Sequence, residues 1–265
     1  MDLGLSGRTA LVTGGSRGIG MAVARRFLRE GAAVVICARD AGRLAQASAR
    51  LIEETGGSVE AVPADVSHEG ALDAVVERAT ERFGGVHILV NNAGRTSGSD
   101  PESFDAVDER LIVRDFEEKH LGYLRAARAV RPYMQSQGWG RIVNVTGMAA
   151  RLAGPISAGA RNAAVVHLTR SMAFALGRSG VTVNAVSPGI TATERLDDLL
   201  GLDAQRRGVS PVQARADMEA QTALGKVVST DEVADAIVFL CSELASGITG
   251  EHLAVSAGRG QGVHY

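Results

Sequence analysis

Short runs of β-branched and aliphatic residues alternate along the chain with longer stretches whose apolar residues recur every three or four positions. The short runs predict buried strands, and the longer stretches predict amphipathic helices. The predicted strands are 9–12, 33–36, 58–62, 86–90, 141–145, 181–186 and 252–255. The predicted helices are 20–30, 41–54, 69–83, 107–137, 160–178 and 230–244. Strands that alternate with helices are typical of βαβ units, so the pattern predicts an α/β fold, a doubly wound parallel sheet of about seven strands with helices on both faces.

No repeat, low-complexity segment or linker interrupts this pattern, so we expect residues 1–265 to form a single domain. Residues 191–229 depart from the regular alternation, are rich in charge and follow a predicted strand. In doubly wound sheets, ligands bind in the crevice outside the carboxyl ends of the strands. The segment 191–229 is therefore predicted to be a substrate lid.

The composition narrows the classes of function. The chain has 45% hydrophobic residues, 22% charged residues and a formal net charge of −2, which gives no global field to attract nucleic acid or an anionic membrane. No apolar run is long enough to span a bilayer, and the first residues show no signal-peptide pattern. The two cysteines, Cys37 and Cys241, favour free thiols in a reducing compartment. We therefore expect a cytoplasmic protein, and the sequence predicts no metal site.

A glycine-rich turn follows the first predicted strand and opens the first predicted helix. Its glycines let the backbone approach a pyrophosphate, and the helix N-terminus offers free N–H groups and a partial positive charge to the phosphates. This context predicts a Rossmann-type dinucleotide site. The turn residues predicted to bind the cofactor are Gly14, Ser16, Arg17, Gly18, Ile19 and Gly20.

The end of the second predicted strand distinguishes NADP from NAD. A carboxylate there would bind the ribose 2′-hydroxyl of NAD, whereas a guanidinium pairs with the 2′-phosphate of NADP. The strand ends in Ala38-Arg39-Asp40, and Arg17 in the glycine turn adds a second cation nearby. Asp40 offers the alternative ribose contact, but its position at a helix start is typical of an N-cap. The residues favour NADP(H) as the cofactor.

Several motifs occur in order and at regular spacing: the glycine turn, Asp65-Val66 after the third strand, Asn91-Asn92-Ala93-Gly94 after the fourth, and Ser187-Pro188-Gly189-Ile190 after the sixth. With these motifs the chain resembles the short-chain dehydrogenase/reductase family, near its 3-oxoacyl-carrier-protein reductase branch. The resemblance covers almost the whole chain. It implies that Asp65 and Val66 bind adenine, that Asn92, Ala93 and Gly94 line the adenosine ribose, and that backbone groups of Pro188, Gly189, Ile190 and Thr191 hold the nicotinamide carboxamide.

The same resemblance reveals four departures at the positions of the family's catalytic residues. Alignment by neighbouring motifs puts the serine position on Gly147, the tyrosine position on Ala158, the lysine position on Asn162 and the asparagine position on Lys119. The chain has only two lysines, the other being Lys226, and no Tyr-x3-Lys sequence occurs in it. Without the tyrosine, general-acid catalysis worth roughly 10²–10⁴-fold is lost.

Lysine and asparagine have exchanged places in this pattern. Lys119 and Asn162 are therefore the candidate catalytic residues, with Lys119 reaching the nicotinamide ribose or a substrate oxygen from the opposite helix. The alternative is that Lys119 points to solvent or pairs with Glu117 or Glu118. Arg161 is a candidate for binding an anionic substrate, or else faces water.

Two further candidates lie outside the motifs: Arg95 at the substrate mouth and Tyr265 as a remote acid.

Three functions stay open. The first is an NADP(H)-dependent oxidoreductase of this family with atypical catalytic residues and a small carbonyl or alcohol substrate. The second is a non-redox dehydratase, isomerase or cyclase, and the third is a non-catalytic NADP(H)-binding subunit. The resemblance also implies a homotetramer or homodimer, through helix 230–244 and the last strand.

Overall fold

The computed structural model describes residues 2–94 and 104–260. A parallel sheet of seven strands forms its centre, in the order β3-β2-β1-β4-β5-β6-β9. The predicted α/β fold is confirmed. The strands are β1 (Thr9–Thr13), β2 (Ala33–Ala38), β3 (Val59–Pro63), β4 (Ile88–Asn91), β5 (Gly140–Val145), β6 (Val181–Pro188) and β9 (His252–Val255).

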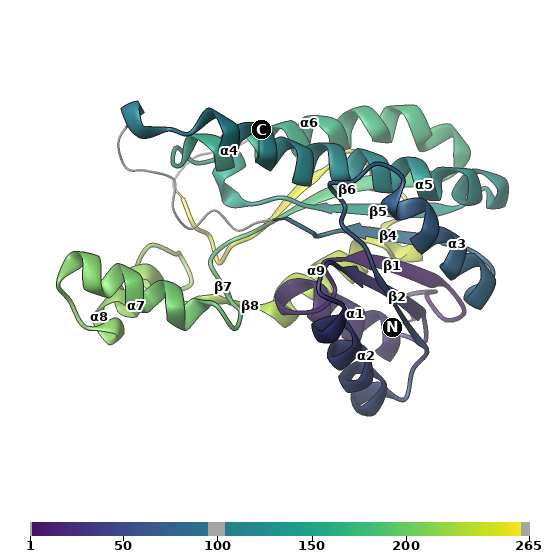
Figure 1. The fold of residues 1–265 in the computed structure, drawn as a ribbon, viewed down its shortest axis with the longest axis horizontal. Helices are drawn as coiled ribbons and strands as arrows, with labels where there is room; N and C mark the ends of the chain where they lie inside the picture. The colour runs from purple at the N-terminus through teal and green to yellow at the C-terminus, as the bar shows by residue number, and fades with distance from the viewer. Residues whose placement is uncertain (1, 95–103, 261–265) are drawn as a thin grey trace.

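Helices cover both faces of this sheet (Figure 1). The helices α1 (Gly18–Arg29), α2 (Ala41–Thr55) and α9 (Thr230–Leu240) bury an apolar core against one face. The helices α3 (Ala71–Phe83), α5 (Gly122–Gln137) and α6 (Ile156–Leu176) bury a second core against the other. Because both faces are covered, the central strands β1, β4, β5 and β6 are buried throughout their length, and their apolar residues predict them as short runs.

The region predicted as one helix, 107–137, consists of three pieces. The helix α4 (Glu109–Asp115) continues into a turn of π-helix, η2 (Phe116–Leu121), and then into α5. The buried stripe along these pieces is apolar in α5, where Tyr123 and Val130 lie inside, but it is charged before that, with Asp115 and Lys119 buried. The chain is thus helical without a break from Glu109 to Gln137, but it is not α-helical throughout. Turns of π-helix are rare and frequently occur at functional sites.

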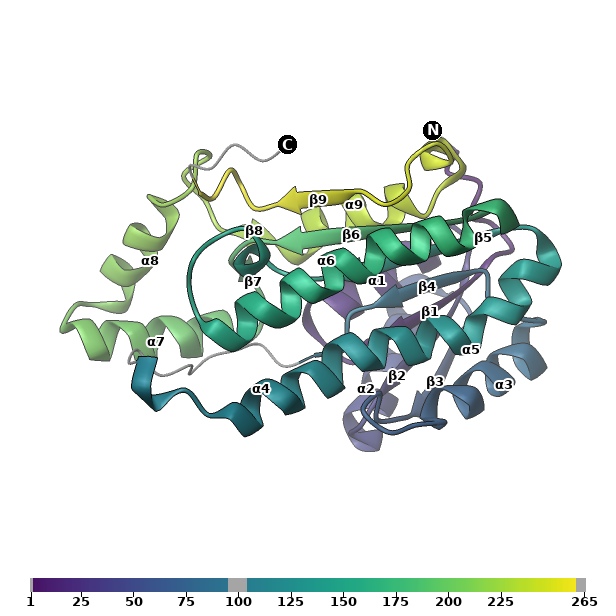
Figure 2. The ribbon, with the colours of Figure 1, turned by 90° about the horizontal axis from the view of Figure 1, so that it is seen from above.

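Residues 191–229 lie beyond the carboxyl ends of the central strands, set apart from the sheet (Figure 2). They contain the helices α7 (Leu196–Arg207) and α8 (Pro211–Glu219), whose small apolar cluster is separate from the two main cores. A two-stranded sheet of β7 (Thr191–Ala192) and β8 (Val228–Ser229) closes the base of this segment. The segment is thus a folded projection joined to the domain at its two ends.

Short helical turns complete the chain: η1 (Phe104–Ala106), η3 (Met148–Ala150), η4 (Gly177–Ser179) and η5 (Glu243–Ala245). Within the described ranges, none of the helices has the length and apolar character needed to cross a membrane.

Candidate functional site

The glycine turn between β1 and α1 is built for close approach of a ligand to the backbone. A Cβ on Gly20 would lie 2.3 Å from the carbonyl oxygen of Gly14 and 2.6 Å from the side-chain amide of Asn92, so only glycine fits there. Gly14 and Gly18 have φ values of 68° and 54°, which glycine adopts without strain. Arg17 at the N-cap of α1 makes no side-chain hydrogen bond to the helix. Apart from the N–H of Gly18, which donates to the carboxylate of Glu194 at 3.4 Å, the first N–H groups of the helix are available to the adjoining cleft.

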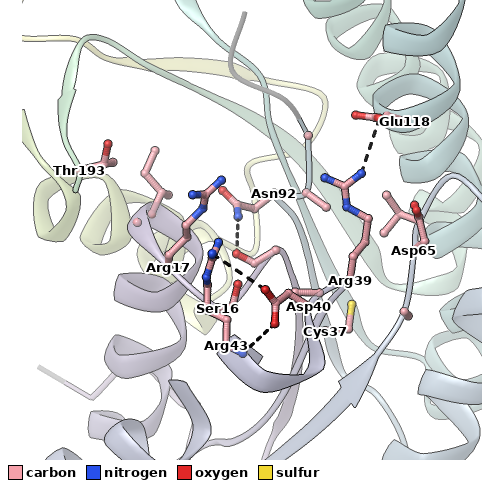
Figure 3. Close-up of a pocket in the computed structure, with 18 of the residues that line it drawn as sticks. Ser16, Arg17, Cys37, Arg39, Asp40, Arg43, Asp65, Asn92, Glu118 and Thr193 are labelled. Carbon is pink, nitrogen blue, oxygen red and sulfur yellow. Dashed lines mark hydrogen bonds and ion pairs between the residues drawn. The ribbon is translucent and has the colours of Figure 1, made fainter. Parts of the chain in front are cut away.

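This cleft runs from the glycine turn to the end of β4, and the arginines that line it are Arg17, Arg39, Arg43 and, from residues 191–229, Arg195. Arg17 lies at the start of α1, while Arg39 and Arg43 lie at the end of β2 and the start of α2 (Figure 3). Asp40 accepts a hydrogen bond from the backbone N–H of Arg43, so the interpretation of Asp40 as an N-cap is correct. The cleft thus gathers guanidinium groups where the ribose 2′-phosphate of a dinucleotide is expected.

Arg39 reaches across the cleft towards Glu118 of η2, at 3.9 Å between Nη1 and Oε1 (Figure 3). Its side chain is 58% exposed, whereas that of Glu118 is 11% exposed. An exposed pair of this length is worth little, so a phosphate can compete for the guanidinium.

Most residues predicted to bind the cofactor line this one cleft, namely Gly14, Ser16, Arg17, Gly18, Ile19, Arg39, Asp65, Val66, Asn92, Ala93 and Gly94. Asn92 has a second task, because its side-chain amide donates to the carbonyl oxygens of Thr13 and Gly14 and thereby holds the glycine turn against β4. Gly20 lies behind the turn. Residues 188–191 lie at the end of β6 and in β7, outside the residues that line the cleft.

The four catalytic positions meet at one place beside the end of β5. Lys119 donates a hydrogen bond from Nζ to the side-chain oxygen of Asn162 at 2.8 Å and another to the carbonyl oxygen of Thr146 at 3.1 Å. A Cβ on Gly147 would lie 3.1 Å from the side-chain nitrogen of Asn162. Ala158 is buried one turn of α6 before Asn162. The exchanged lysine and asparagine are therefore in direct contact.

Lys119 does not point to solvent, since it is 8% exposed, and its partners are neither Glu117 nor Glu118. A Cβ on Gly94 would lie 3.5 Å from its Cδ, so the stem of the lysine passes the end of the cofactor cleft. Burial lowers the pKa of Lys119 to about 7. The Arg161 guanidinium also lowers this pKa, whereas the Asp115 carboxylate raises it. The amine can therefore exist in both protonation states near neutral pH.

Arg161 lies inside the protein and does not face water. Its guanidinium forms an ion pair with Asp115 at 2.5 Å, and Asp115 also accepts a hydrogen bond of 2.6 Å from the hydroxyl of Ser157. The side chains of Arg161 and Asp115 are 4% and 3% exposed. Nothing in the sequence pattern predicted this pair, because Asp115 belongs to a stretch whose helical phase changes in the π turn.

No described tyrosine takes the place of the missing acid. The hydroxyl of Tyr123 donates to the carbonyl oxygen of Val145 at 2.8 Å, and burial raises its pKa far above the usual range. Arg95 and Tyr265 lie outside the described residues. In residues 2–94 and 104–260 no group of three His, Cys, Asp or Glu side chains could hold a metal ion.

Sequence reasoning missed several residues that line the cleft, namely Arg43, Glu118, Thr193, Glu194 and Arg195. Arg43 could have been found, because it lies one turn beyond the predicted cap Asp40. The last three could not, because they come from residues 191–229, whose path the sequence does not define. The carboxylate of Glu194 accepts a hydrogen bond from the N–H of Gly18 at 3.4 Å.

The chain is similar in sequence to known reductases and dehydrogenases over most of its length. The family model described as Enoyl-(Acyl carrier protein) reductase matches residues 14–259. The short-chain reductase protein NovJ of Streptomyces niveus is 34% identical over 258 residues, covering 94% of this chain and 93% of that protein. The 7alpha-hydroxysteroid dehydrogenase of Escherichia coli K12 is 33% identical over 259 residues, covering 97% and 96%.

Solved structures agree with this similarity. L-sorbose reductase from Gluconobacter frateurii, complexed with NADPH and L-sorbose, superposes with a TM-score of 0.91 at 31% identity, covering 97% of this chain and 98% of the other. A variant of actinorhodin polyketide ketoreductase with NADPH gives a TM-score of 0.88 at 31% identity, covering 94% and 96%.

Proposed function

Because the chain belongs to the short-chain dehydrogenase/reductase family, we propose that it is an NADP(H)-dependent oxidoreductase in which Lys119 has replaced the usual catalytic group. Its substrate is a small carbonyl or alcohol compound. The observation that carries the proposal is the contact between Lys119 and Asn162 beside the cofactor cleft. The contact supports the proposal because it joins a titratable amine to Asn162, the residue at the family's lysine position.

The predicted cofactor fits the residues present. The glycine turn excludes a Cβ at Gly20, the N-cap residue Arg17 makes no side-chain hydrogen bond to α1, and four arginines border the cleft. The NADPH-bound reductases described above support the same cofactor. When bound, NADPH supplies the hydride for a carbonyl carbon.

Lys119 then has two tasks in this proposal. Two of its three N–H groups are held by Asn162 and Thr146, which leaves the third for a ribose hydroxyl or a substrate oxygen. As an ammonium it donates a proton to the carbonyl oxygen, which becomes the alcohol, and the neutral amine accepts one in the reverse direction. Ala158 and Gly147 have no proton to give.

We expect NADPH to bind at least about ten times more tightly than NADH, since a charge-assisted pair with phosphate contributes about 1.5–3 kcal/mol. Arg39→Ala should remove most of this preference by weakening NADPH binding alone. Fluorescence titration of both cofactors measures the two dissociation constants. Arg50→Ala is the control, because Arg50 is an exposed residue of α2 whose guanidinium pairs with Glu54 outside the cleft. Equal constants for the two cofactors in the natural protein would refute the assignment.

The absence of a hydroxyl at positions 147 and 158 favours a second candidate function. The same fold would then carry out a non-redox reaction, such as dehydration, isomerisation or cyclisation, or would bind NADP(H) without catalysis. The discriminating experiment combines NADPH titration with absorbance of the nicotinamide band during incubation with a panel of ketones, aldehydes and alcohols. Tight binding without any change of absorbance across the panel would favour this second candidate.

Three further features complete the proposal. The folded projection of α7 and α8 acts as the substrate lid.

Exposed apolar side chains, among them Phe174 on α6 at 84% and Leu253 on β9 at 41%, favour a homodimer or homotetramer. Sedimentation of the purified protein distinguishes these states from a monomer. Cys37 and Cys241 are both buried free thiols, in keeping with the reducing cytoplasm.

A further inference from the structure

A buried charge network lies next to the proposed catalytic amine. Asp115 and Arg161 form an ion pair between α4 and α6, and Ser157 donates its hydroxyl to the same carboxylate oxygen, Oδ2. Removing two charges from water costs free energy that their attraction only partly offsets, and apolar replacements of such pairs are often neutral or stabilising. A purely structural role therefore explains this pair poorly.

The pair is linked to both partners of the Lys119 contact through the chain. Asp115 lies four residues before Lys119, and both side chains lie on the same buried stripe. Arg161 directly precedes Asn162, whose side chain accepts the hydrogen bond from Lys119. One positive and one negative charge are thus fixed beside the amine from two different helices.

We propose that Asp115 and Arg161 are positioning residues that set the charge of the Lys119 amine, with Arg161 favouring the neutral form and Asp115 the ammonium. The inference rests on the proposed role of Lys119. Together the two charges poise the amine between its two forms, which is the condition for donating and accepting a proton at neutral pH. The direction agrees with the lowering of the Lys119 pKa by Arg161 and its raising by Asp115.

The other groups around Lys119 leave this assignment intact. From η2, Glu118 is directed across the cleft to Arg39. From α5, the ring of Tyr123 lies 5.9 Å from Nζ, and its hydroxyl is committed to Val145. From β5 and α6, Thr146 and Asn162 contribute neutral oxygens. Asp115 and Arg161 are thus the charged groups that act on the amine among the described residues.

The composition of the chain permits a direct test. With only two lysines, protein labelled with ¹³C-lysine gives two side-chain ε-methylene signals, and Lys226→Arg leaves that of Lys119 alone. In protein that keeps Lys226, the signal of this half-exposed lysine, which is paired with Glu232, serves as the internal reference. The titration midpoint of Lys119 is then followed by NMR from about pH 5 to about pH 12, a range that includes the ordinary lysine value, without any need for turnover.

The two single variants should shift this midpoint in opposite directions, each by about one pH unit or more. Asp115→Asn lowers it, because the cation of Arg161 is no longer balanced, and Arg161→Gln raises it. Asp115→Glu keeps the carboxylate and should restore a midpoint near that of the natural protein. A merely structural pair would give no shift, or shifts of the same sign, and either result would overturn the inference.

The double variant Asp115→Asn/Arg161→Gln leaves no unbalanced buried charge, so it should fold even where one of the single variants does not. It then tests the inference together with the single variant that folds. In the double variant the midpoint of Lys119 should return from that of the folded single variant towards that of the natural protein, and a midpoint that stays where the single variant left it overturns the inference. The failure of the proposed function has a different signature. In that case Lys119 of the natural protein would titrate near the ordinary lysine value of about 10.4.

Discussion

Small ketones and 3-oxoacyl thioesters are expected to be reduced by the natural protein with a turnover number below about 1 s⁻¹, the lower end of the usual range for enzymes. The reason is the absence of a hydroxyl at Gly147 and Ala158: no serine polarises the carbonyl, and the proton for the forming alkoxide has to come from Lys119 in place of a tyrosine. Absorbance of the nicotinamide band at saturating NADPH measures the rate. A turnover number within the usual range would show that another group performs the work of the missing tyrosine.

Restoring the family residues should raise this rate by about 10²–10⁴-fold. The variant combines Gly147→Ser, Ala158→Tyr, Lys119→Asn and Asn162→Lys. All four are needed together, because a Cβ on Gly147 would press against the side chain of Asn162 at 3.1 Å, so Gly147→Ser alone would disturb the contact with Lys119. The matched control replaces Ala158→Tyr by Ala158→Phe, which supplies the ring without the hydroxyl and should show no gain.

Lys119→Ala should weaken NADPH binding by at least tenfold, or abolish whatever turnover the natural protein shows, without a comparable loss of thermal stability. Lys119→Arg should not restore the function, because a guanidinium stays protonated near neutral pH. The double variant Lys119→Asn/Asn162→Lys returns the lysine to the family position and should recover binding but not ketoreduction. A natural function unchanged by Lys119→Ala would contradict the role proposed for this residue.

The pH dependence of stability offers an independent check on Lys119. Its pKa is about 7 in the folded chain and about 10.4 when unfolded, so between these values the unfolded state binds more protons and the native protein gains stability as pH rises. Lys119→Met abolishes this gain. The free energy of unfolding of the Met variant relative to the natural protein should therefore fall by a few kcal/mol between pH 7 and pH 10.5. Thermal melts of both proteins across this range measure it.

The sheet and the cofactor cleft could be predicted from sequence because both depend on local signals. The central strands are buried on both faces, so their apolar runs are continuous, and the glycine turn is defined by its neighbours in the chain. Strand ends differ by only one to two residues from the prediction for β1, β2 and β6. The predicted NADP(H) preference likewise depends on one residue, Arg39, next to a predicted strand end.

The catalytic region could not be predicted to the same depth because its features depend on tertiary packing. The resemblance to the family located Lys119 and Asn162 but left the direction of the lysine side chain open between solvent and cofactor. The π turn that contains Lys119 has no signal of its own in the residues 116–121. The pair of Asp115 and Arg161 joins residues far apart in sequence, so only the folded chain reveals it.

The packing of α1 against α9 has a consequence for biosynthesis. Phe27 of α1 and Ile237 of α9 belong to the same apolar core, although about 200 residues separate them along the chain. At elongation rates of about 5–20 residues per second, roughly 10–40 s pass between the synthesis of α1, which follows the phosphate-binding turn, and the synthesis of α9, which covers it. The apolar face of α1 is therefore exposed to aggregation and to chaperones for most of translation, and the cofactor half of the molecule is completed only when synthesis is nearly over.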